Sequence, residues 1–199
     1  MVRMKRLLAL ALALGALVLM GSVFAQNDRL NIGAGAEITT LDPRIATDVP
    51  SFERIAVIME PLVVFGKDLG LEARLATDWA FAEDGSSLTF KLREGVTFHD
   101  GRPFTSADVK DTFEWVLDPE NGAQNRPLYA TIESIDTPDD YTVVMNLNVL
   151  NSFLLNNIAR MPIVPAGSGA EFGDNPIGTG PYQFVELVRD DRLVVRSFA

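Results

Sequence analysis

Residues 88–115, LTFKLREGVTFHDGRPFTSADVKDTFEW, decide the fold of this chain. In residues 88–93, apolar Leu and Phe alternate with polar Thr, Lys and Arg, and this period of two predicts a strand with one apolar and one wet face. Glu94 and Gly95 end the strand, and residues 99–101 form a second turn in which Gly101 suits a positive φ. The stretch contains no catalytic or metal-binding motif, so it indicates a binding scaffold rather than an enzyme.

A capped amphipathic helix follows in the same stretch. Thr105 and Asp108 have the spacing of a capping box, in which each residue bonds the backbone amide of the other. Apolar residues then recur with helical spacing at Val109, Phe113 and Val116. Because Pro119 disfavours helical geometry in the residue before it, the helix is expected to end at Asp118.

The remaining predicted elements are short and alternate in type. Turn signals separate paired strands in three hairpins: 79–82 with 88–93, 132–137 with 141–147, and 183–188 with 193–196. Further strands are expected over residues 29–34 and 62–65, and helices over residues 50–59 and 151–160. Several hairpins with few helices predict a mixed α+β fold.

The composition is that of an ordinary globular protein. The chain has 199 residues, 47% of them hydrophobic and 22% charged, and its net charge is −10 at pH 7. This acidic balance argues against nucleic acid and anionic membrane surfaces as partners. A solvated acidic surface explains the charge more simply than a cationic ligand does. The chain has no cysteine, which excludes disulfides, thiolate chemistry and cysteine-based zinc sites.

Residues 1–25 have the parts of a secretory signal peptide. They open with three basic residues: Arg3, Lys5 and Arg6. An apolar core over residues 7–20 follows, and Val23 and Ala25 stand at positions −3 and −1 of the expected cleavage site. The alternative is an uncleaved anchor, since the apolar stretch is just long enough to span a bilayer. The cleavage pattern predicts a periplasmic or extracellular protein whose folded part is residues 26–199.

Four segments, in order along the chain, together resemble one known family. They are LDP at 41–43 with IMEPL at 58–62, RLATDW at 74–79 with EDG at 83–85, the stretch 88–115, and PIGTGPY at 176–182. Their order and spacing are similar to those of extracellular solute-binding proteins of family 5. These are the dipeptide-, oligopeptide- and nickel-binding components of ABC importers. The resemblance extends from about residue 28 to residue 199.

The resemblance implies a type II periplasmic-binding-protein fold. Members of the family are much longer, so it implies the first lobe only, incomplete, with the distal lobe absent, as in a truncated product. It also implies capture of a peptide or similar small solute in a cleft between two lobes, followed by docking of the closed form on ABC permease subunits at the membrane. No cofactor and no nucleic acid are implied. Two alternatives stay open: a non-functional fragment and a secreted α+β enzyme.

Ligand contacts are expected in three parts of the chain. The first is the turn after the first predicted strand, which faces the cleft in the family: Gly35, Ala36, Glu37 and Thr39. Tyr129 lies where the resemblance places an aromatic ring at the cleft wall, able to stack on ligand. The guanidinium of Arg160, at the end of a predicted helix, has the geometry to clamp a carboxylate. The plainer alternatives are an ordinary turn, a core tyrosine and a cation at a helix C-terminus.

The other polar groups are interpreted as structural. His99 is the only histidine, and one histidine without cysteine makes a poor metal site. Residues 178–180, GTG, lack the Lys-Ser/Thr pair of a phosphate loop and indicate a tight turn entering a strand. There is no GxSxG motif, and the aspartate pairs at 139–140 and 190–191 lie in hairpin turns, where carboxylates stay solvated. The sequence therefore predicts no metal site and no catalytic residue.

Overall fold

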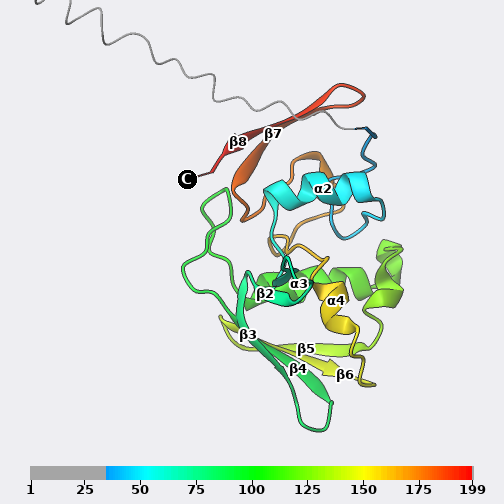
Figure 1. Ribbon diagram of the computed structural model, residues 1–199, viewed down its shortest axis with the longest axis vertical. Helices are drawn as coiled ribbons and strands as arrows, with labels where there is room; N and C mark the ends of the chain where they lie inside the picture. Colours follow the sequence, from blue (N-terminus) through cyan, green and yellow to red (C-terminus); the bar gives the residue numbers. More distant parts are fainter. Residues whose placement is uncertain (1–34, 199) are drawn as a thin grey trace, which may run out of the picture. The chain divides into compact units, whose positions relative to one another are not determined.

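The computed structural model describes residues 35–198, which combine helices and strands as predicted (Figure 1). The expected signal peptide and the expected strand over residues 29–34 lie outside the described residues. Within residues 35–198, no helix is both long enough and apolar enough to cross a bilayer.

A four-stranded antiparallel sheet is the largest element of the fold. Its strands are β3 (Ala76–Phe81), β4 (Ser87–Leu92), β5 (Ile132–Asp139) and β6 (Thr142–Leu147), in the spatial order β3–β4–β6–β5. The β3–β4 and β5–β6 pairs are the first two predicted hairpins, so both predictions are confirmed. β4 shows the expected alternation, because Leu88, Phe90 and Leu92 are buried whereas Lys91 is exposed.

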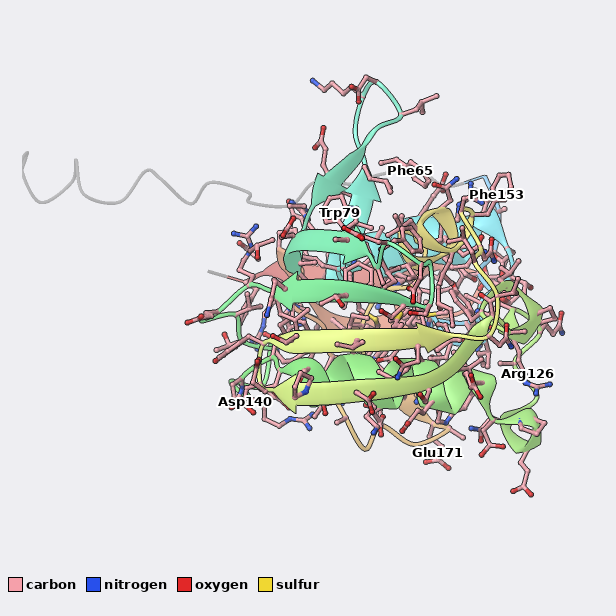
Figure 2. The ribbon with its side chains drawn as sticks, turned by 90° about the horizontal axis from the view of Figure 1, so that it is seen from below. Phe65, Trp79, Arg126, Asp140, Phe153 and Glu171 are labelled. Carbon is pink, nitrogen blue, oxygen red and sulfur yellow. The ribbon has the colours of Figure 1, made fainter. Side chains whose placement is uncertain are left out.

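Helix α3 (Ser106–Leu117) packs against β5 and β6 and covers one face of this sheet (Figures 1 and 2). The predicted capping box begins the helix: the Asp108 carboxylate accepts hydrogen bonds from the amide (2.7 Å) and the hydroxyl (3.2 Å) of Thr105. The predicted apolar stripe is fully buried: Val109, Phe113 and Val116. The helix ends before Pro119, as expected, with Asp118 in extended geometry.

The helix expected over residues 151–160 is shorter in the structure. Only α4 (Leu154–Ile158) is helical. At its start the side chain of Asn151 accepts the amide of Phe153 (3.0 Å), and at its end the amide of Arg160 bonds the carbonyl of Asn157 (3.0 Å). These local bonds hold the flanking residues in turns, because an Asn side chain competes with the helical hydrogen-bond pattern.

A second group of elements is formed by α2 (Val49–Ile58) and the third predicted hairpin, β7 (Tyr182–Val188) with β8 (Arg192–Ser197). β7 contacts α2, and the two strands pair only with each other among the described residues (Figure 1). The smaller elements are the antiparallel pair β1 (Val63–Phe65) and β2 (Leu71–Ala73) and the 3-10 helices Pro119–Asn121, Arg126–Leu128 and Phe172–Asp174.

Two hydrophobic clusters make up the described core. The first joins the four-stranded sheet to α3, and its large aromatic members are Phe90, Phe98, Phe104, Phe113 and Tyr129. The second lies around α2, and residues of β7 and β8 pack against it; its larger members are Leu41, Ile55, Ile58, Met59 and Phe172. Ile177 packs against both clusters.

Residues 178–180, here called the glycine strap, connect the two groups of elements. The backbone N–H of His99 donates to the carbonyl of Gly178 (2.9 Å). The imidazole ring accepts the N–H of Gly178 at Nδ1 (3.2 Å) and donates from Nε2 to the carbonyl of Gly180 (2.9 Å). Gly180 in turn donates its N–H to Ile58 O (2.9 Å). A Cβ on Gly178 would lie 2.1 Å from that same oxygen of Ile58, so the close approach of the strap to α2 requires glycine at this position. The strap leads into β7, as expected, although among the described residues no hydrogen bond closes a tight turn over residues 178–180.

Candidate ligand-binding site

Residues 36–40, here called the binding segment, contain three of the predicted ligand contacts. Ala36, Glu37 and Thr39 are all exposed, and Gly35, just before them, is exposed as well. Ile38 is buried and belongs to the second hydrophobic cluster. Ile38 is thus the one side chain of residues 36–39 that is buried, and its neighbours are exposed.

Polar side chains in the first turn of α2 hold the end of the binding segment. The hydroxyl of Ser51 accepts the amides of Thr39 (3.0 Å) and Thr40 (3.3 Å). Asp48, the N-cap of α2, accepts the amide and the hydroxyl of Ser51, both at 2.8 Å, and the hydroxyl of Thr39. The hydrogen bond from Thr39 is the largest cause that holds the pKa of Asp48 below its ordinary value.

Two weaker contacts hold the start of the same segment. Glu37 accepts the amide of Asp190, in the β7–β8 turn, at 3.3 Å. Arg54, on α2, donates from Nη2 to the carbonyl of Ala36, also at 3.3 Å. Both bonds are exposed to solvent, so they orient the segment less firmly than Ser51 does.

Arg160 lies just beyond α4 and is exposed. Its guanidinium carbon is 6.0 Å from the centre of the Phe65 ring, which is itself 39% exposed (Figure 2 labels Phe65). Within residues 35–198, Arg160 forms no ion pair. An exposed guanidinium beside an aromatic ring suits a ligand that has both a carboxylate and an apolar part.

Tyr129 lies in the core of the described structure. It is 2% exposed, its ring packs edge-on against Phe113 at 5.3 Å, and its hydroxyl donates to the carbonyl of Asn157 (3.0 Å). Burial raises the pKa of Tyr129, and the nearby charge of Arg160 opposes that shift. In this conformation the ring has no face open to a ligand, as the core-tyrosine alternative expects.

The candidate residues thus fall into two groups. Tyr129 and Arg160 lie near each other beside α4, whereas the binding segment lies against α2. Within residues 35–198, no hydrogen bond or ion pair joins the two groups. The sequence did not single out Ser51 or Asp48, although an aspartate two residues before Pro50 is a recognisable helix-start signal.

Among residues 35–198, His99 is held by contacts with backbone. Both ring nitrogens of His99 bond the backbone of the glycine strap, which leaves neither available as a base. No group of three metal-ligating side chains occurs in the described part of the chain. A hollow of about 580 Å³ is lined by residues of β3, β4 and the β5–β6 turn, among them Asp140. Asp140 is labelled in Figure 2. Lys91 lines this hollow, and its ammonium already donates a hydrogen bond to the hydroxyl of Thr142 (2.8 Å).

The described residues have the fold of type II periplasmic binding proteins, and they correspond to about a third of such a protein. The PBP AgaA from A. tumefacien R10, solved in complex with agropinic acid, is 32% identical with a TM-score of 0.76, over 82% of this chain and 34% of that one. A dipeptide-binding protein from Pseudoalteromonas sp. SM9913, in complex with Met-Leu, is 27% identical with a TM-score of 0.75, over 83% of this chain and 38% of that one.

Residues 70–199 match the family described as bacterial extracellular solute-binding proteins, family 5 Middle, and the chain belongs to this family. Among curated relatives, the glutathione-binding protein GsiB of Pectobacterium atrosepticum is 35% identical over 89% of this chain and 35% of its own length. GsiB of Escherichia coli K12 is 32% identical over 95% of this chain and 38% of its own length. The chain therefore spans little more than a third of the curated relatives that it matches, and the expected family resemblance is confirmed.

Proposed function

We propose that this chain is part of the substrate-binding component of an ABC importer, and that its solute is a peptide or peptide-like molecule. The observation that carries the proposal is family membership combined with relatives that are named glutathione-binding proteins. Glutathione is a small peptide with carboxylate, ammonium and amide groups. It is therefore the first ligand to test.

The proposed contacts for such a solute are the two groups described above. Arg160 binds a ligand carboxylate, since its guanidinium is exposed and the ring of Phe65 beside it adds apolar surface. Gly35, Ala36, Glu37 and Thr39 supply backbone and side-chain contacts from the exposed binding segment. Tyr129 contributes indirectly, because its hydroxyl bonds the carbonyl of Asn157, three residues before Arg160.

The proposed mechanism is capture by closure. Ligand binds between two lobes, the closed state has the higher affinity, and the closed form docks on permease subunits in the membrane. The expected signal peptide would deliver the protein to the periplasm or beyond the cell. We further propose that the protein carries out no catalysis, which is supported by the occupied ring of His99 and by relatives that bind solutes.

The test is a titration of the purified chain with reduced glutathione and with a dipeptide library, followed by calorimetry and NMR. We expect saturable but weak binding, no tighter than millimolar, because part of the ligand contacts belongs to the distal lobe. Arg160→Ala should weaken the binding, and Arg160→Lys should restore only part of it. A micromolar dissociation constant would contradict the need for a second lobe.

The competing outcome is a chain that binds nothing. If no peptide changes any NMR signal at millimolar concentrations, the proposal fails and the non-functional fragment is favoured. Arg74→Ala serves as the matched control, since Arg74 is also exposed but already pairs with Glu60 at 2.9 Å. Its removal should leave glutathione binding unchanged.

A further inference from the structure

We infer that Ser51 is a positioning residue for the ligand: its buried hydroxyl turns two consecutive backbone carbonyls of the binding segment away from α2, toward hydrogen-bond donors of the ligand. The inference rests on the proposed function, because it takes the binding segment to contact the solute. It adds a residue that has no contact with the ligand and that the family resemblance did not point to.

The hydroxyl of Ser51 uses all of its hydrogen-bonding capacity. A serine hydroxyl has one donor and two acceptor positions. Here it accepts the amides of Thr39 (3.0 Å) and Thr40 (3.3 Å) and donates to Asp48 (2.8 Å). Ser51 is 0% exposed, so water cannot take over these bonds when the hydroxyl is removed.

Binding two consecutive amides fixes two peptide planes at once. The described chain has no cis peptide bond, and in a trans peptide the C=O points opposite to the N–H. Because the N–H groups of Thr39 and Thr40 point to Ser51, the carbonyls of Ile38 and Thr39 point away from α2. Two carbonyl oxygens held in this direction are acceptors for an ammonium or amide N–H, which are the donors that a peptide ligand offers.

Asp48 completes the arrangement by orienting the hydroxyl. Its carboxylate accepts both the amide and the hydroxyl of Ser51, and it also accepts the hydroxyl of Thr39. The proton of Ser51 is therefore directed to Asp48, which leaves the oxygen lone pairs for the two amides. A preorganised segment of this kind binds ligand without first being ordered, and this lowers the entropic cost of binding.

The experiment uses the purified full chain, labelled with ¹⁵N, in four forms: wild type, Ser51→Ala, Ser51→Thr and Ser106→Ala. Ser106 is the matched control, since it is also buried in the first turn of a helix, and its hydroxyl bonds a carbonyl, that of Asp139, at 2.7 Å. Two quantities are measured for each form: amide hydrogen exchange at Thr39 and Thr40, and the dissociation constant for reduced glutathione from chemical shifts.

We expect Ser51→Ala to speed exchange at both amides about tenfold or more and to weaken glutathione binding about fivefold or more. Ser51→Thr keeps the hydroxyl and should restore both quantities to within about twofold. Ser106→Ala should change neither, although it lowers stability.

Three results would overturn the inference. If Ser51→Ala binds glutathione as wild type does, Ser51 is structural only, while the proposed function stands. If Ser106→Ala weakens binding equally, the effect is general destabilisation. If the wild-type chain does not respond to glutathione or to dipeptides, the proposed function itself fails, and the positioning role fails with it.

Discussion

The four-stranded sheet and the β7–β8 hairpin are both antiparallel, yet they are buried very differently. Strands β4 and β6 bury three and four residues respectively, whereas no residue of β7 or β8 is buried. In the hairpin, Tyr182, Val185 and Val188 are 42%, 49% and 38% exposed. The difference comes from coverage, because α3 packs over one face of the sheet (Figure 1) and the hairpin has only the smaller cluster around α2 beneath it.

This comparison shows which of the proposed ligand contacts lie in the less buried region. A two-stranded hairpin is marginal by itself and depends on what it docks against. Here it docks through the glycine strap and the second cluster, next to the binding segment, which Glu37 joins to Asp190. The proposed ligand contacts at residues 36–40 thus lie in the less buried region, where local opening costs least.

The largest expected difference is between two phenylalanines. Phe90, in β4, is 0% exposed, and Phe90→Ala should cost about 3–5 kcal/mol of the free energy of unfolding. Phe184, in β7, is only partly buried, and Phe184→Ala should cost about 1–2 kcal/mol because less apolar surface is lost. Urea denaturation of both variants measures the difference. Equal losses would show that the hairpin is as well packed as the sheet.

The next largest effect is expected at the glycine strap. A Cβ on Gly178 would meet the Ile58 oxygen at 2.1 Å, and this oxygen is backbone, so Gly178→Ala should cost about 1–3 kcal/mol. The matched control is Gly169→Ala, since a Cβ there has no heavy atom within 4 Å. Hydrogen exchange should show that the Gly178 variant opens β7 and β8 before the sheet. If the hairpin and the four-stranded sheet open together in this variant, the strap does not control the opening of the hairpin.

The same comparison explains which features the sequence could predict. Residues 88–115 were predicted well because a period of two, a capping box and a proline stop are local signals. The three hairpins were predicted for a similar reason, from turn residues between short strand segments. By contrast, the helix over residues 151–160 was predicted too long, because the side chain of Asn151 bonds the backbone of Phe153 instead of permitting another helical turn.

Long-range contacts were beyond the reach of local signals. His99 was correctly interpreted as structural, but nothing near it in sequence shows that its ring bonds Gly178 and Gly180. Ser51 reads as an ordinary helical serine until Thr39 and Thr40 are seen to donate to it. The ligand-binding roles of the candidate residues remain predictions, and the burial of Tyr129 depends on packing against Phe113 that no sequence pattern specifies.

An effect of moderate size is expected from acid, which should weaken the hydrogen bonds that hold residues 36–40 to α2. The hydrogen bond from Thr39 lowers the pKa of Asp48 in the folded protein. A lowered carboxyl pKa contributes stability that is present above the ordinary value, about 3.9, and is lost as the pH falls below it through the folded value. The amides of Thr39 and Thr40 should therefore lose protection from exchange as the pH falls below about 4, after correction for intrinsic rates.

Two variants make this pH experiment specific. Asp48→Asn should show less protection at pH 5 and little further loss in acid, because the titrating group is gone. Asp84 also has a lowered pKa, through its bonds to Ser86, but it lies in the β3–β4 turn. Asp84→Asn should therefore leave the acid response of Thr39 and Thr40 unchanged. An unchanged acid response in Asp48→Asn would assign the effect to another carboxylate.

The smallest expected effect is on the exposed face of β7. Val185 is 49% exposed, so Val185→Thr should change the free energy of unfolding by no more than about 0.5 kcal/mol. The same substitution at Val143, which is 0% exposed in β6, buries a hydroxyl and should cost about 1–3 kcal/mol. Because exposed apolar side chains promote association, Val185→Thr should also slow aggregation in light scattering, whereas Val143→Thr should speed it. If the two substitutions cost the same, the face of β7 is covered in solution, and the contrast between hairpin and sheet does not hold there.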